Sequence, residues 1–296
     1  MRLGINSNRR TEGLRKGFRA IKGILLTCFW LTSQMFTEHM QDFRPIIKVI
    51  EEDYEIPQLG KHRRISALLP YNYESTTRSY PVLYMQDGQN LFNPQAPFGD
   101  WAIDRSLSKL AAEEMSDIIV IAIDHGEEER INEYLPFSNT RFGESQGELY
   151  VQFLLSTLKP YVDNNFRVKI DRLNTGIGGS SLGGLISLYA GLTQPDYFSR
   201  LMVFSPSLWI SPMINHYGAN YSPSSPAYLY LYAGAKESKY HIRNVELFKA
   251  SLLRHKPSYP NVNFRLSINE NGEHAERYWA EEFPKALKWL YFNDNE

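Results

Sequence analysis

The segment Asn174-Thr175-Gly176-Ile177-Gly178-Gly179-Ser180-Ser181-Leu182-Gly183 decides the fold of this chain. Its first five residues are mostly small and suit a short buried strand, and a helical pattern of apolar residues follows it from Leu185 to Leu192. Gly179 and Gly183 lie two residues on either side of Ser181, where longer side chains would collide with the neighbouring strand and helix. The segment therefore predicts a strand, a sharp turn that carries Ser181, and a helix.

A serine on such a turn can act as a nucleophile. The first amide N–H groups of the following helix point toward negative charge that develops beside the hydroxyl, so the N–H of Leu182 would form half of an oxyanion hole. The alternative is a turn that only allows the helix and strand to pack closely. A second Gly-x-Ser-x-Gly match, residues 143–147, follows a polar segment with no strand before it. We interpret Ser145 as a loop residue in a chance match.

A nucleophilic serine needs a base, and the base needs a carboxylate, in the chain order serine, acid, histidine for this topology. His274 follows the strand-like stretch Phe264–Ile268 and precedes the last predicted helix. We predict that it is the general base, with helix capping as the alternative. His241 and His255 fall on a predicted helix from Tyr240 to Lys256, where solvated histidines are ordinary.

Glu237 is the predicted acid. The apolar stretch Leu201–Phe204 is followed by Ser205–Trp209, which holds no carboxylate, whereas Tyr228–Tyr232 is followed by a loop in which Glu237 is the first carboxylate. Glutamate can replace aspartate in this role if the loop absorbs its extra methylene. A solvated Lys236–Glu237 charge pair at a helix start is the alternative.

The second oxyanion donor belongs in the turn after the strand-like stretch Tyr80–Met85. Gly88 lets the backbone turn sharply there, and the amide N–H of Gln89 would then point into the site. Asp87 would instead hold this loop in place through its carboxylate.

Short apolar runs suited to strands buried on both faces alternate with amphipathic segments through the rest of the chain. The remaining strand-like run is Ile118–Ile123, and an opening hairpin is predicted from Ile46–Ile56 and Arg64–Leu69. Helical spacing marks residues 149–162, 245–252 and 275–292, with Pro284 restarting the last helix as a first-turn residue. The alternation predicts one α/β domain with a mostly parallel sheet of about eight strands flanked by helices, and no large lid domain.

Composition excludes several classes of protein. The 296 residues are 43% hydrophobic, enough for a sizeable core, and 32 basic against 33 acidic residues give a net charge of -1, so no global field favours nucleic acid or an anionic membrane. The single cysteine, Cys28, forms no internal disulfide and offers no metal motif, which fits a cytoplasmic protein.

Residues 1–43 differ from the domain predicted over 44–296. Seven basic residues and one acid precede Gly23–Phe36, a stretch of fourteen uncharged residues that is too short to cross a bilayer as a helix. One interpretation is a poorly ordered basic extension, and the other is a targeting or anchoring segment that would export the chain or attach it to a membrane.

The chain resembles the putative-esterase family of α/β-hydrolases, which includes esterase D, feruloyl esterases and enterochelin esterase-like proteins. The resemblance covers about residues 44 to 292 and is carried by residues 84–92, 101–104, 179–184, 205–209 and 272–274, which read YMQDGQNLF, WAID, GSSLGG, SPSLW and GEH. It implies an α/β-hydrolase fold and a serine hydrolase of small-molecule carboxylic esters that uses no cofactor. Ser181 and His274 lie on matching motifs, and Glu237 lies at the position of the acid.

Four residues on loops after strands are candidate substrate contacts, because open α/β sheets bind ligands there. They are Trp101, Trp209, Arg130 and Tyr134. An aromatic wall with Arg130 would suit a polar or acidic group, while the alternative is a solvated loop whose aromatic residues are buried for packing. Two other functions stay open: an acyltransferase that passes the same acyl group to a sugar or alcohol, and a non-catalytic binding protein on a hydrolase scaffold.

Overall fold

One sheet organises the computed structural model, which describes residues 43–115, 117–254 and 261–292. Its strand order is β1-β2-β4-β3-β5-β6-β7-β8, with β1 and β2 antiparallel to their neighbours and the other strands parallel. The strands are β1 (Ile46–Ile56), β2 (Lys61–Leu69), β3 (Val82–Gln86), β4 (Ile119–Ile123), β5 (Thr175–Ser180), β6 (Arg200–Phe204), β7 (Ala227–Gly234) and β8 (Val262–Asn269). The predicted eight-stranded, mostly parallel sheet and its opening hairpin are confirmed.

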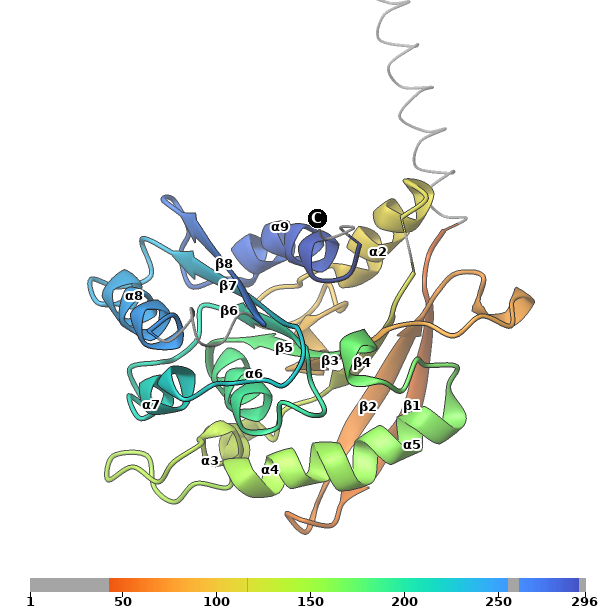
Figure 1. Cartoon of the computed structure of the whole chain (residues 1–296). Coiled ribbons are helices and arrows are strands. Elements are labelled where there is room, and N and C mark those ends of the chain that lie inside the picture. The colour runs from red at the N-terminus through yellow and green to blue at the C-terminus, as the bar shows by residue number, and fades with distance from the viewer. Residues whose placement is uncertain (1–42, 116, 255–260, 293–296) are drawn as a thin grey trace, which may run out of the picture. The chain divides into compact units, whose positions relative to one another are not determined.

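Helices cover both faces of the sheet (Figure 1). They are α2 (Ile103–Ala112), α3 (Arg130–Tyr134), α4 (Gly147–Phe153), α5 (Lys159–Asn165), α6 (Ser181–Thr193), α7 (Ile214–Ala219), α8 (His241–Leu252) and α9 (Glu276–Leu287). Helices α2 and α9 pack in one apolar core with Phe204 and Trp279, while α4 to α8 pack on the other face in a core that includes Phe153, Leu185 and Phe248. Both faces of β3, β4, β6 and β7 are therefore dry, which explains their mostly apolar sequences.

Two helices depart from their predicted form. The segment predicted over 149–162 belongs to a longer helical run in which Leu154–Leu158 is a π-helical turn between α4 and α5. The prediction that Pro284 restarts the last helix is wrong, because α9 continues through this proline. Phe283, Ala286 and Leu287 are buried in the same core on either side of Pro284, and this packing keeps the chain helical despite the missing N–H.

Some predictions concern residues outside the described ranges. These residues are the extension 1–42, which includes Cys28, and His255 at the end of the predicted helix. Within the described ranges, no helix combines the length and apolar character needed to cross a membrane.

The functional candidates gather at one edge of the sheet because neighbouring parallel strands end together. Asp87 follows β3, Ser181 follows β5, Glu237 follows β7 and His274 follows β8. Strand register aligns Ser180 with Phe204 and Gly234 with Asn269, so residues from distant parts of the chain meet at the carboxyl ends.

Candidate active site

Ser181 lies on the predicted sharp turn between β5 and α6. Its φ is 57°, a left-handed value that a serine adopts only when the surroundings enforce it. A Cβ atom on Gly179 would lie 2.8 Å from the carbonyl carbon of Gly183, and one on Gly183 would lie 2.5 Å from Asp87 Oδ2. Only hydrogen fits at these two positions, so the glycines allow the strand, turn and helix to close on one another.

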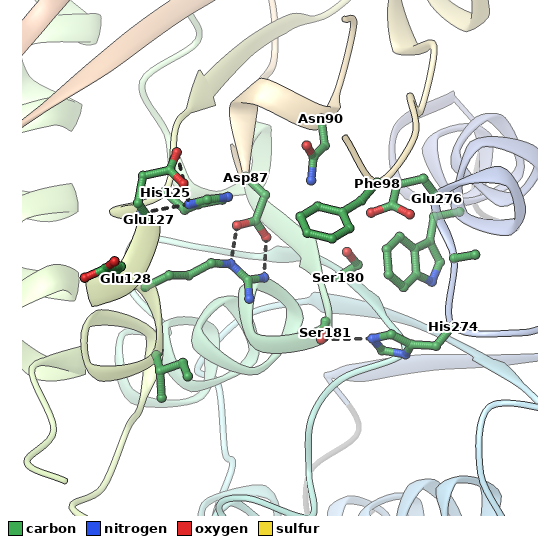
Figure 2. A pocket seen from close by; sticks show the side chains of 14 residues that line it. Asp87, Asn90, Phe98, His125, Glu127, Glu128, Ser180, Ser181, His274 and Glu276 are labelled. Atoms are coloured by element: carbon green, nitrogen blue, oxygen red, sulfur yellow. Dashed lines mark hydrogen bonds and ion pairs between the residues drawn. The ribbon is translucent and has the colours of Figure 1, made fainter. Parts of the chain in front are cut away.

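Ser181, His274 and Glu237 form a chain of hydrogen bonds. Figure 2 shows the hydrogen bond between Ser181 and His274. The distance from Ser181 Oγ to His274 Nε2 is 3.0 Å, and His274 Nδ1 lies 2.7 Å from Glu237 Oε2. Ser181 Oγ also lies 3.3 Å from Ser207 Oγ. The three residues that the sequence indicated are thus brought together in the order hydroxyl, imidazole, carboxylate. This arrangement can move a proton away from the hydroxyl and stabilise the cation that results.

Glu237 is buried and fully engaged. Its side chain is 3% exposed, and Oε1 accepts hydrogen bonds from Ser205 Oγ at 2.5 Å and from the Gly234 N–H at 2.7 Å. Burial alone would raise the pKa of this carboxyl, but the hydrogen bond to His274, the nearby His241 and the donors on Oε1 outweigh it and hold the pKa below its ordinary value. The carboxylate therefore stays charged beside His274 at neutral pH.

Trp279 links this carboxylate to the imidazole. Its indole Nε1 donates a hydrogen bond to Ser205 Oγ at 2.9 Å, and Ser205 in turn donates to Glu237. The same indole meets the His274 ring edge to face, with centroids 5.0 Å apart. One side chain of α9 thus supports both the acid and the base of the hydrogen-bonded chain.

His241 lies against Glu237 instead of in solvent, so the prediction of a solvated histidine is wrong for it. It is 7% exposed, and its Nε2 lies 3.3 Å from Glu237 Oε2. His241 is the first residue of α8 and lies on its buried face with Val245, Phe248 and Leu252. Its place on this apolar face is the sequence feature that could have indicated a buried side chain.

Two backbone donors were predicted for an oxyanion. Leu182 begins α6 directly after Ser181, and Gln89 lies in the turn after β3. Leu182 lies in the first turn of α6, where amide N–H groups have no partner inside the helix. The side chain of Gln89 accepts a hydrogen bond from the His125 N–H at 3.0 Å, which fixes this loop against the one after β4.

Asp87 holds its loop in place, as the alternative for this residue foresaw. Arg130 Nε lies 2.6 Å from Asp87 Oδ1, and Arg130 Nη2 lies 2.8 Å from Oδ2 (Figure 2). This bidentate contact fixes the orientation of the guanidinium relative to the carboxylate. It joins the loop after β3 to helix α3.

A pocket of about 810 Å³ opens in front of Ser181 and His274. Figure 2 shows His274 and Glu276 on one side of Ser181, and Glu127 and Glu128 on the other. Four of its lining residues are carboxylates (Asp87, Glu127, Glu128 and Glu276), against one guanidinium, Arg130, which is already paired with Asp87. Burial raises the pKa of Glu276. The pocket is therefore acidic, with the exposed ring of Phe98 at its rim.

Of the four predicted substrate contacts, only Arg130 lines this pocket. Trp101 is 2% exposed and stacks on Phe204 in the core, and Tyr134 is fully buried beside Tyr150. The prediction that these two residues contact substrate is wrong, because both rings are buried and pack against other aromatic side chains in the core. Trp209 is exposed but lies outside the pocket lining, where it meets Phe142 edge to face.

The second Gly-x-Ser-x-Gly match lies away from this site. Ser145 hydrogen-bonds the carbonyl of Leu135 just before α4 and does not line the pocket. Among the described residues, no group of three or more His, Cys, Asp and Glu side chains is arranged to hold a metal ion.

Comparisons with known proteins agree with this fold. The model of the family described as "Putative esterase" matches residues 56–290, and the chain belongs to this family of carboxylic ester hydrolases with an α/β-hydrolase fold.

Among its relatives, protein YbbA of Bacillus subtilis is 26% identical over 242 residues, which cover 78% of this chain and 93% of YbbA. An endo-1,4-beta-xylanase/feruloyl esterase of Xylanibacter ruminicola is 25% identical over 65% of this chain, which spans only 25% of that enzyme.

Solved structures share the fold. An IroE-like serine hydrolase from Shewanella oneidensis has a TM-score of 0.64 at 18% identity, over 82% of this chain and 79% of that one. The enterobactin esterase FES from Shigella flexneri, solved with 2,3-dihydroxy-N-benzoyl-serine, also has a TM-score of 0.64, at 19% identity over 84% of this chain and 59% of that one.

Proposed function

We propose that the protein is a serine esterase that cleaves carboxylic esters through an acyl-enzyme intermediate. The observation that carries this proposal is the chain of hydrogen bonds from Ser181 through His274 to Glu237, built on a strained turn at the floor of a pocket. An isolated serine hydroxyl is a weak nucleophile, and an imidazole within hydrogen-bond reach removes that limitation.

In the first half of the reaction, Ser181 Oγ attacks the ester carbonyl carbon and His274 Nε2 accepts its proton. The tetrahedral intermediate collapses when His274 returns this proton to the leaving alcohol oxygen. Glu237 fixes the imidazole through Nδ1 and stabilises its cation. Water then attacks the acyl-enzyme with His274 again as base, which releases the acid and restores Ser181.

The amide N–H groups of Leu182 and Gln89 are the proposed oxyanion donors. Leu182 lies at the N-terminal end of α6, where first-turn N–H groups have no partner inside the helix and the helix dipole favours negative charge, and Gln89 lies in the turn after β3. One such donor is typically worth about 3 to 4 kcal/mol of transition-state stabilisation.

The test is turnover of a chromogenic carboxylic ester by Ser181→Ala, with Ser145→Ala as the matched serine control. We expect Ser181→Ala to lose about 10⁶-fold in kcat, because the three groups act as a unit, and Ser145→Ala to stay within twofold of the wild type. If Ser181→Ala keeps a tenth of the activity, Ser181 is not the nucleophile. Adding acceptor alcohols to the wild type and analysing the products separates hydrolysis from acyl transfer.

A further inference from the structure

We propose that His241 is a positioning residue for this reaction: its imidazole holds Glu237 in the orientation that serves His274. The inference rests on the proposed function, since it concerns the same carboxylate. Two imidazoles converge on one oxygen, Glu237 Oε2, with His274 Nδ1 at 2.7 Å and His241 Nε2 at 3.3 Å.

The imidazole of His241 lies against Glu237. His241 is buried, and its Nε2 makes no hydrogen bond within the described residues, although Glu237 Oε2 lies only 3.3 Å away. The titratable groups that face it are Glu237 and His274. Burial lowers the pKa of His241, the charge of Glu237 raises it, and His274 lowers it further. The pKa of His241 therefore lies below its ordinary value. A neutral imidazole at neutral pH can only satisfy the carboxylate by donating from Nε2.

Both oxygens of Glu237 are then held from two directions. Oε1 accepts hydrogen bonds from Ser205 and the Gly234 N–H, while Oε2 is hydrogen-bonded to His274 Nδ1 and lies 3.3 Å from His241 Nε2. Without His241, Oε2 would lose this second imidazole and keep the hydrogen bond to His274. The longer glutamate side chain makes this support more important than it would be for aspartate, because one more torsion must be fixed.

The same contact makes the site sensitive to acid. When His241 is protonated, its charge offsets that of Glu237 and opposes formation of the His274 cation. Because burial holds the pKa of His241 below its ordinary value, this occurs on the acid side of neutrality.

The experiment compares His241→Leu, which has no donor, with His241→Gln, whose amide nitrogen can replace Nε2 and does not titrate. His216→Leu on α7 is the control, because His216 lies outside the pocket lining. We expect His241→Leu to lose about tenfold to a hundredfold in kcat with KM changed less than threefold, and His241→Gln to stay within threefold of the wild type. On the acid side of neutrality, log(kcat/KM) should fall more steeply with decreasing pH in the wild type than in His241→Gln.

Equal losses of kcat in His241→Leu and His241→Gln would overturn the proposal, because they indicate a structural role only. No loss of kcat in either variant would also overturn it, because His241 would then have no role in the reaction. If His241→Leu does not fold, the pH slope of His241→Gln decides, and a slope unchanged from the wild type overturns the proposal. Labelling of the wild type with a fluorophosphonate tests the proposed function separately. The proposed function fails if the labelled residue is not Ser181, whatever the His241 variants do.

Discussion

The indole Nε1 of Trp279 donates a hydrogen bond to Ser205 Oγ at 2.9 Å, and through Ser205 a wall of the substrate pocket is joined to the carboxylate of Glu237. Ser205 has a φ of 45° and is fully buried, so its hydroxyl has little freedom to choose other partners. The pair places a polar link inside an apolar core. Such a link favours one orientation of the groups that it joins.

Trp279→Phe should lower kcat by about threefold to tenfold, because phenylalanine keeps the ring but loses the donor. Ser205→Ala removes the next bond of the same link. In a double-mutant cycle on kcat, we expect the combined variant to lose less than the product of the two single losses. Losses that multiply fully would show that the two residues act independently.

Glu237→Gln tests the acid with little change of shape. We expect kcat to fall by about 10³-fold to 10⁴-fold, because an amide cannot stabilise the imidazole cation and favours the wrong tautomer. The pKa of Glu237 lies below its ordinary value in the folded protein, so the wild type should keep this charge throughout an assay between pH 5 and 9. Glu246→Gln, at a half-buried position of α8 where the carboxylate pairs with Lys249 instead of a histidine, is the control. A loss smaller than tenfold would contradict the role of Glu237.

Gly179→Ala should destabilise the turn that carries Ser181. The added Cβ would lie 2.8 Å from backbone of α6, a contact that only a backbone shift relieves, at a cost of about 1 to 3 kcal/mol. The midpoint of thermal unfolding should fall by about 3 to 10 °C, and kcat should fall with it. Gly60→Ala, in the β1–β2 turn with no atom within 4 Å of its new Cβ, should cost only its backbone strain and leave kcat unchanged. Equal kcat in both variants would contradict this account of the turn.

Glu276→Gln tests the acidic character of the pocket. We expect the wild type to prefer the cationic ester acetylcholine to its uncharged isostere 3,3-dimethylbutyl acetate, because four carboxylates and one paired guanidinium line the pocket. Removing the charge of Glu276 should reduce this preference in kcat/KM by about threefold to tenfold at low salt, and less at high salt. Glu281→Gln, on the same helix but outside this pocket, is the control. An unchanged preference in Glu276→Gln would remove this residue from substrate selection.

Most of the fold could be predicted from the sequence because the features that indicate it lie within short stretches of the chain. Apolar runs such as Ile119–Ile123 are continuous where both faces of a strand are covered, and the glycines around Ser181 report a close approach that no other residue allows. The positions of Ser181, Glu237 and His274 at the carboxyl ends of three parallel strands then followed from parallel topology alone.

What the sequence did not predict depends on which way side chains turn after the loops fold. Trp101 and Tyr134 follow strands as substrate contacts do, yet their rings turn into the cores. His241 lies on the same buried face of α8 as Val245 and Phe248, but no local pattern identifies Glu237, on the preceding loop, as the group that it meets. Pro284 was misjudged because packing on both sides of it outweighs the lost hydrogen bond.

The most direct test of the central claim is to locate the covalent adduct of a fluorophosphonate by peptide mass spectrometry. The account predicts one adduct per chain on the peptide that contains Ser181, the same adduct in Ser145→Ala, and none in Ser181→Ala. An adduct on Ser145, or full labelling of Ser181→Ala, would contradict it.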